Sequence, residues 1–123
     1  MNGPKYVRSE PHGNTLVITP LFTFATFHEP HVASEWTGVQ EQLDSPETQN
    51  VIVDLGEIPY FGSTVLEWMA QMWKKMKAKG GQLAVARPSK IGREVLSAAR
   101  MERLWGIFET REEALEWLAK VPS

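Results

Sequence analysis

Short apolar runs separated by polar turns predict the strands of this protein. Residues 51–55 are almost continuously apolar and β-branched, which is typical of a central strand buried on both faces. Residues 82–86 form a second run of this kind. Near the N-terminus, residues 15–19 are a β-rich run that a proline ends, and the turn signal at 12–14 suggests a hairpin with residues 6–10.

Apolar residues that recur every three or four positions predict two longer helices, at about 30–44 and at 64–79. The first stripe comprises Val32, Trp36, Val39 and Leu43, and the second comprises Val65, Met69, Met72 and Met76. Pro30 fits the first turn of the first helix, and the glycines at 80–81 are a fitting stop for the second. The segment 21–27 is ambiguous and suggests a part-buried extended stretch.

The C-terminal third predicts two more helices with a short strand at 104–108 between them. Ser89 is a candidate N-cap for a helix with Ile91, Val95 and either Ala98 or Ala99 facing inward. Thr110 and Glu113 form a capping box that opens the final helix. Alternation of strands and helices implies an α/β fold, with a mixed or parallel central sheet and helices packed on it.

Composition places the chain among ordinary globular proteins and excludes several classes. Its 123 residues are expected to form one domain, 1–123. The absence of cysteine excludes disulfides and thiolate metal sites. No apolar run approaches the roughly 18 residues of a membrane span, and the first residues lack the apolar core of a signal peptide. We therefore expect a cytoplasmic protein that does not insert into membranes.

Charge gives no hint of a nucleic-acid partner, because the net charge is −2 and no basic stripe stands out. The densest basic patch lies on a predicted helix and is interpreted as a solvated face: Lys74, Lys75, Lys77 and Lys79.

Candidate catalytic and metal-binding residues are few. His12, His28 and His31 crowd the N-terminal third, but a metal site needs a third ligand and the helical spacing of zinc-binding histidines is missing. Asp54 ends a predicted strand, where sites of α/β proteins often lie, but no nucleophile and base accompany it. We expect no metal, no cofactor and no enzymatic activity.

The segment 51–85 is the most informative part of the chain. It contains a strand ending in Asp54-Leu55, a loop with Pro59-Tyr60-Phe61, the sequence Gly62-Ser63-Thr64-Val65 opening a helix, and later Lys79-Gly80-Gly81. This pattern, together with Met101-Glu102-Arg103-Leu104 further on, resembles the STAS domain over roughly residues 15–118. The resemblance implies the STAS (SpoIIAA-like) fold, a mixed central sheet of four to five strands with about four helices packed on it.

The same resemblance implies a function. The best-known STAS domains are anti-sigma factor antagonists, regulators of transcription that bind an anti-sigma factor kinase and are switched by phosphorylation. The phosphorylated position of the family corresponds to Thr64, with Ser63 beside it. The family aspartate is Gly62 here and the family glycine is Val65, which favours a second reading. In that reading the chain is a non-phosphorylated subunit of a larger assembly, a stressosome-like complex or a lipid or anion transporter.

A partner is expected to bind the loop and the start of the helix that follows it. The candidate contact residues are Tyr60, Phe61, Gly62, Ser63, Thr64, Glu67 and Trp68. Two structural alternatives stay open. Thr64 and Glu67 also form a capping box, in which Thr64 serves only as an N-cap. Trp68 and Trp73 flank the apolar stripe of this helix, where they serve either the core or a partner surface.

Overall fold

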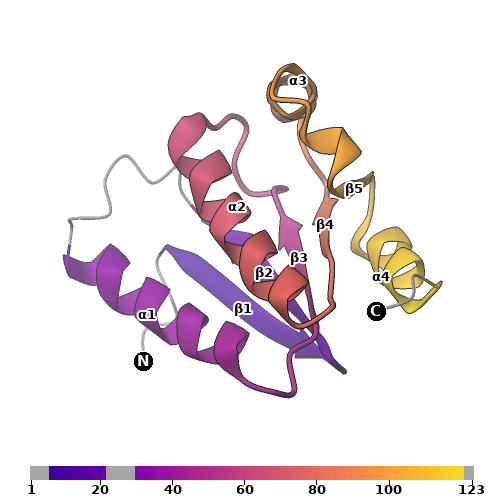
Figure 1. The fold of residues 1–123 in the computed structure, drawn as a ribbon. Helices are drawn as coiled ribbons and strands as arrows, with labels where there is room; N and C mark the ends of the chain where they lie inside the picture. The colour runs from indigo at the N-terminus through magenta and orange to yellow at the C-terminus, as the bar shows by residue number, and fades with distance from the viewer. Residues whose placement is uncertain (1–5, 22–29, 121–123) are drawn as a thin grey trace.

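The computed structural model describes residues 6–21 and 30–120, without the side chains of Pro30 and His31. Within these residues five strands and four α-helices alternate in the α/β order expected, so that the helices pack on a mixed sheet (Figure 1). The elements are β1 Val7–His12, β2 Thr15–Pro20, α1 Pro30–Asp44, β3 Asn50–Asp54, α2 Ser63–Ala78, β4 Leu83–Ala86, α3 Lys90–Ala98, a 3-10 helix Met101–Arg103, β5 Gly106–Phe108 and α4 Arg111–Lys120.

The sheet has the strand order β1-β2-β3-β4-β5. The hairpin β1–β2 is antiparallel, as the turn signal indicated, and the pairs β2–β3, β3–β4 and β4–β5 are parallel. The three parallel connections run through helices, as parallel pairing requires. The carboxyl ends of β3 and β4 therefore lie at one edge of the sheet, together with the loops that follow them.

Helices cover the two faces of the sheet unequally. On one face α1 and α2 enclose the larger core, to which β3 contributes Val51 and Val53. On the other face Ile52 of β3 packs against Ala114 and Leu118 of α4. Both predicted stripes line the larger core, and the three methionines of α2 are completely buried. The expected burial of the strand at 51–55 on both faces is thus confirmed.

Local capping signals are right at two helices, whereas one residue expected on the inner face of α3 is exposed. The Ser89 hydroxyl accepts a hydrogen bond from the Gly92 amide at 2.9 Å, which makes it the N-cap of α3. Thr110 and Glu113 exchange the hydrogen bonds of a capping box. In α3, however, Gly92 and Leu96 are the buried residues, whereas Ile91 is 55% exposed.

Two further expectations concern the segment before α1 and membrane insertion. The segment 21–27 lies outside the described residues from 22 onwards, as does His28. Among the described residues, no helix has the length and apolar character needed to cross a membrane.

Lys79 and Lys75 do not belong to a freely solvated face, contrary to the sequence interpretation. The Lys79 ammonium donates to the backbone carbonyl oxygens of Leu43, Ser45 and Thr48. These hydrogen bonds hold the end of α1 and the connection to β3 in place. Lys75 lies 2.8 Å from Asp44 at the end of α1. The basic run therefore helps to attach α2 to the end of α1.

Candidate functional site: the loop after β3 and the start of α2

The loop between β3 and α2 is attached to its surroundings at both ends. At its start the Leu55 amide donates to the Ala86 carbonyl at 2.9 Å, which extends the pairing of β3 with β4. Further along, the Ser89 hydroxyl donates to the Pro59 carbonyl at 2.5 Å. Ile58 is buried. These contacts hold the loop against the connection between β4 and α3.

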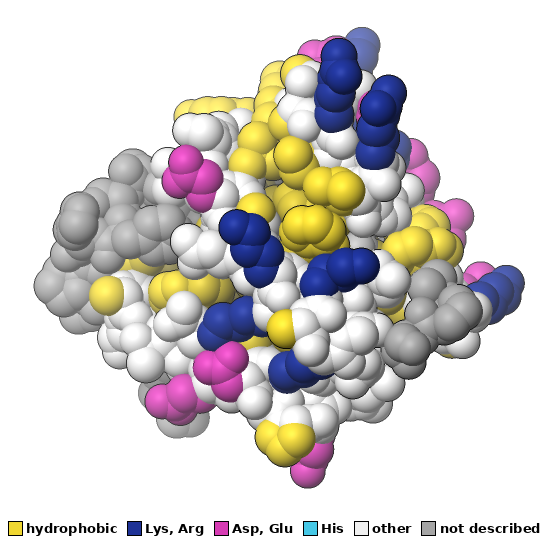
Figure 2. Space-filling view, viewed as in Figure 1, with side chains coloured by type: hydrophobic (Ala, Val, Ile, Leu, Met, Phe, Trp, Pro, Cys, Tyr) yellow, Lys and Arg dark blue, Asp and Glu magenta, His cyan; other side chains and the backbone are white. Residues whose placement is uncertain are grey.

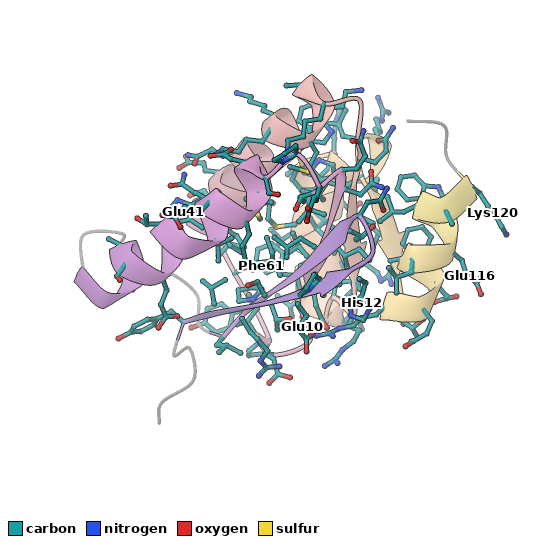
Figure 3. All side chains as sticks on the ribbon, turned by 90° about the horizontal axis from the view of Figure 1, so that it is seen from below. Glu10, His12, Glu41, Phe61, Glu116 and Lys120 are labelled. Carbon is teal, nitrogen blue, oxygen red and sulfur yellow. The ribbon has the colours of Figure 1, made fainter. Side chains whose placement is uncertain are left out.

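Phe61 completes this attachment and is buried in the larger core (Figure 3). Its ring lies against Gly92 of α3, where a side chain would leave too little space, because an added Cβ would come within 2.9 Å of the ring. Phe61 therefore cannot offer its side chain to a partner, and its expected place on the binding surface is wrong. Tyr60, held between Pro59 and Phe61, is 61% exposed.

The helix α2 begins at Ser63, with Gly62 as its N-cap in an extended conformation. Ser63 is exposed and Thr64 is half-buried. The capping box expected of Thr64 and Glu67 is wrong, because Thr64 lies inside the first turn instead of preceding it. Among the described residues, neither the Ser63 nor the Thr64 hydroxyl makes a hydrogen bond. Both remain available, close to the free backbone amides at the start of the helix.

Trp68 is 1% exposed, so the interpretation of its side chain as a partner contact is also wrong. Its ring centroid lies 5.2 Å from that of Trp36, because α1 covers this flank of α2. Trp73 on the other flank is only half-buried, as its position at the edge of the stripe predicted. Of the seven expected contact residues, five remain accessible, and we call them the switch surface: Tyr60, Gly62, Ser63, Thr64 and Glu67.

Apolar residues that the sequence did not assign to this region lie beside the switch surface. Ile91, in the first turn of α3, follows Ser89, which is bonded to the residue before Tyr60. The exposed side chains of Tyr60 and Ile91 thus flank one hydrogen bond. Figure 2 shows a hydrophobic area between α2 and α3, bordered by Lys and Arg side chains. Half-buried residues of α2, α3 and the 3-10 helix pack on the larger core: Leu66, Ala70, Trp73, Val95 and Met101.

Asp54 lies at the end of β3, on the face of the sheet that α4 covers. Its carboxylate is buried and accepts from the Gly56 amide at 2.8 Å and from Arg111 Nε at 2.5 Å. Arg87 follows directly after β4, and its Nε lies 3.5 Å from Asp54 Oδ1, the oxygen that accepts from the Gly56 amide. Asp54 is therefore held by structural contacts, and no nucleophile or base adjoins it among these partners.

Arg111 was not singled out from the sequence, where it is one of several charged residues at the start of a helix. Its guanidinium also donates to Glu10 at 2.7 Å and to Thr19 at 3.0 Å. Burial by itself lowers the pKa of Arg111, but the hydrogen bonds and charges of Asp54 and Glu10 outweigh it and raise the pKa above its ordinary value. Arg111 therefore stays charged and ties α4 to three strands.

Comparison with known proteins agrees with this geometry. The family model of the STAS domain matches residues 12–114. No curated protein matches the chain significantly.

Solved structures share the fold at low sequence identity. A STAS domain protein of Planctomyces limnophilus is 24% identical with a TM-score of 0.77, covering 93% of this chain and 98% of its own. The anti-sigma factor antagonist SpoIIAA in its unphosphorylated form is 14% identical with a TM-score of 0.73, covering 95% and 99%. An anti-sigma factor antagonist from Mycobacterium paratuberculosis is 16% identical with a TM-score of 0.72, covering 98% and 100%. The family match spans most of the sequence and the fold agrees with it: the chain belongs to the STAS domain family.

Proposed function

We propose that this protein is a non-enzymatic regulator, similar to anti-sigma factor antagonists, that binds an anti-sigma factor kinase through the switch surface. The observation that carries the proposal is a pair of accessible hydroxyls, those of Ser63 and Thr64, at the start of α2 beside the exposed Tyr60. Membership of the STAS family and structural similarity to anti-sigma factor antagonists support a regulatory role.

Binding in this proposal depends on a surface that is already formed. The loop is held by the Ser89 bond and by the buried Phe61, so little conformational entropy is lost when a partner covers it. Tyr60 supplies an aromatic side chain of the kind that often dominates binding energy. Its burial under a partner adds apolar contact, and Ile91 extends this area along α3.

Phosphorylation at Thr64, or at Ser63 beside it, would switch binding off by local charge. A phosphate adds about −1.5 to −2 charges and three acceptor oxygens. At the start of α2 it lies near free amides and the positive end of the helix dipole, so the domain itself needs no rearrangement. A partner packed over the loop must instead desolvate the phosphate, which weakens binding strongly. Glu67, one turn after Thr64, adds to the negative charge at this point.

The direct test is phosphorylation by the cognate anti-sigma factor kinase with ATP, followed by intact mass measurement. We expect the gain of one phosphoryl group, lost in Thr64→Ala and kept in Ser63→Ala. Absence of any gain, while the kinase phosphorylates a control substrate, contradicts the switch. A gain that disappears only in Ser63→Ala moves the site to Ser63.

Partner binding is tested separately by titrating the unphosphorylated protein with the kinase. Tyr60→Ala is expected to weaken binding at least tenfold, since truncating a central aromatic anchor typically costs about 2 kcal/mol. Leu104→Ala is the matched control, because Leu104 is also an exposed large apolar residue but lies outside the switch surface. Equal effects of the two variants contradict the proposed location.

The second candidate function is a non-phosphorylated STAS subunit of a larger assembly, such as a stressosome-like complex or a lipid or anion transporter. Gly62 favours it, because no carboxylate stands at the N-cap of α2 where the family has aspartate. Under this alternative the protein gains no phosphate and stays associated with its assembly in the presence of ATP. Co-purification with and without ATP distinguishes the two candidates.

A further inference from the structure

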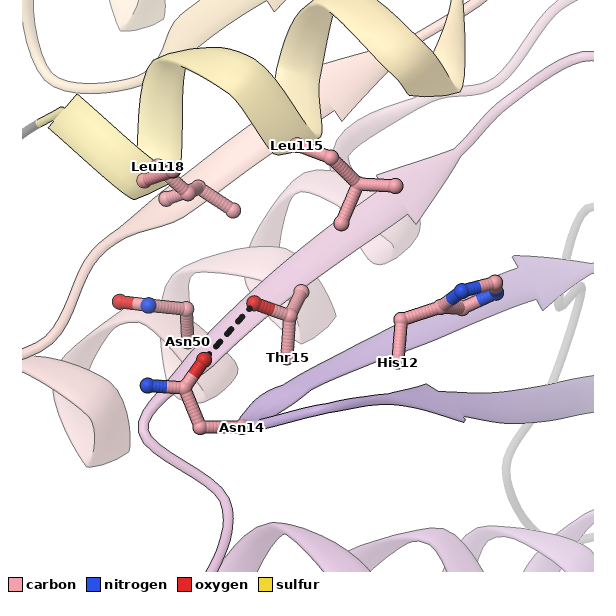
Figure 4. A pocket seen from close by; sticks show the side chains of 7 residues that line it. His12, Asn14, Thr15, Asn50, Leu115 and Leu118 are labelled. Carbon is pink, nitrogen blue, oxygen red and sulfur yellow. Dashed lines mark hydrogen bonds between the residues drawn. The ribbon is translucent and has the colours of Figure 1, made fainter.

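A hollow of about 340 Å³ lies under α4, away from the switch surface. It is bounded by the turn end of the β1–β2 hairpin, the start of β3 and the second half of α4 (Figure 4). Strand β3 begins at this hollow with Asn50 and ends at Asp54, beside the loop that leads to α2. The volume falls within the range of small-molecule pockets, roughly 300–1,000 Å³.

The floor of the hollow is polar where the neighbouring strand positions are apolar. Thr15 and Asn50 are register partners in the parallel pair β2–β3 and are only 5% and 7% exposed. Both face α4, because Val17 and Ile52, two residues further along the same strands, belong to the core beneath that helix. Two buried polar side chains thus lie side by side at the bottom of an open hollow.

One hydrogen bond fixes the orientation of the Asn50 amide. Its Oδ1 accepts from the backbone amide of Gln82 at 2.9 Å, which leaves Nδ2 as the end that has donors to offer. Among the described residues, Nδ2 has no hydrogen-bond partner. This donor opens onto the hollow, so that a ligand oxygen placed there can accept from it in place of water.

The side chains next to Asn50 extend this donor set. The Thr15 hydroxyl donates to Asn14 Oδ1 across 3.4 Å, a long hydrogen bond that leaves the Asn14 Nδ2 free to donate. His12, the register partner of Thr15 in β1, adds an imidazole at the rim (Figure 4). None of the described residues that line the hollow is acidic. The polar side of the hollow therefore suits a ligand whose oxygen accepts hydrogen bonds.

The opposite wall is apolar, because Leu115, Leu118 and Ala119 of α4 face the hollow. We propose that this hollow binds a small molecule in which a carboxylate or amide oxygen adjoins a short apolar group. The oxygen accepts from Asn50 Nδ2 and the neighbouring donors on the floor, and the apolar group lies against the leucines. This site is independent of the switch surface, which lies at the other ends of β2 and β3.

Three probes of equal chain length test the proposal by NMR titration of the isotope-labelled protein: hexanoate, hexanamide and hexylamine. We expect saturable shifts of the Asn50 side-chain amide signals with hexanoate or hexanamide, and none with hexylamine, which has no acceptor oxygen. Binding of only one of the first two identifies a charged or a neutral acceptor as the preferred ligand. Equal binding of hexylamine, or no saturable shift with any probe, overturns the proposal.

A pair of variants shows whether the shifts come from this hollow. Ala119→Trp fills it from the wall, whereas Ala78→Trp makes the same change at another exposed alanine in the last turn of a helix, α2. Binding should be lost in the first variant and kept in the second, both of them being folded by circular dichroism. Shifts that persist in Ala119→Trp overturn the site. His12→Ala, at an exposed rim position, provides a second variant, which we expect to fold and to bind the probe at least threefold more weakly.

Discussion

Arg111 Nε lies 2.5 Å from Oδ2 of the buried Asp54, although 57 residues separate them in the sequence. The same guanidinium reaches Glu10 and Thr19, so one side chain at the start of α4 joins β1, β2 and β3. Asp54 also accepts a hydrogen bond from the Gly56 amide, at the start of the loop between β3 and α2. The end of β3 is therefore held by α4 on one side and by its own loop on the other.

Replacing Arg111 by leucine should destabilise the protein by about 2–3 kcal/mol, because the Asp54 carboxylate would stay buried with its main cationic partner removed. The figure is below that for a fully buried pair, since Arg111 is partly exposed. Urea denaturation measures it. Arg93→Leu is the control: Arg93 pairs with Glu109 at 2.7 Å on the surface, and its loss should cost no more than about 0.5 kcal/mol. Equal losses of stability in the two variants would show that the buried Asp54 pair contributes no more than the surface pair.

Two helix glycines test the packing of Phe61. Gly92→Ala brings a methyl group within 2.9 Å of the buried Phe61 ring, whereas Gly38→Ala in α1 meets open space. Gly38→Ala should stabilise by up to about 1 kcal/mol through helix propensity. Gly92→Ala gains the same propensity but must displace the ring, a cost of about 1–3 kcal/mol. Thermal unfolding of both variants should place Gly92→Ala below Gly38→Ala by that difference, and equal stabilities would refute the close contact.

Gly62→Asp restores the residue that the STAS pattern has before the hydroxyl pair. A Cβ at Gly62 has no atom within 4 Å, and the backbone is extended with φ −120°, so aspartate fits without strain. The new carboxylate can cap the free amides of α2, and we expect a gain of a few tenths of a kcal/mol. We also expect faster phosphorylation of Thr64 by the anti-sigma factor kinase, measured as initial rate. A destabilised variant would contradict the open environment of Gly62.

Lys79→Met removes an ammonium that donates to three backbone carbonyl oxygens at the end of α1 and in the connection to β3. Hydrogen bonds to charged groups contribute about 1.5–3 kcal/mol, and water can replace part of this loss at a half-buried site. We therefore expect a destabilisation of about 1–2 kcal/mol in chemical denaturation. Lys74→Met, on the exposed side of the same helix, should change stability by less than about 0.5 kcal/mol. If the Lys74 change costs as much, general charge effects explain both results.

The wrong predictions for Trp68 and Ile91 share one cause: they required knowing which element packs against a side chain. Trp68 lies at the edge of its apolar stripe by helical angle, but α1 brings Trp36 against that edge and buries it. Ile91 looks like an inward residue of α3, but the helix turns Gly92 toward the core to accommodate Phe61. Thr64 and Glu67 have capping-box spacing, but the N-cap of α2 is Gly62, two residues before Thr64.

Hydrophobic periodicity and capping signals predicted the strands, the two long helices and two of the helix caps, because these signals depend on residues that are close along the chain. The STAS family was indicated by the motif between Asp54 and Val65. The same motif also located the hydroxyl pair at the start of a helix. Which side chains remain exposed, and which distant charges meet as Arg111 and Asp54 do, became visible only in the folded molecule. Burial and long-range pairing depend on how whole elements pack, and residues far apart in the chain carry no local signal of that packing.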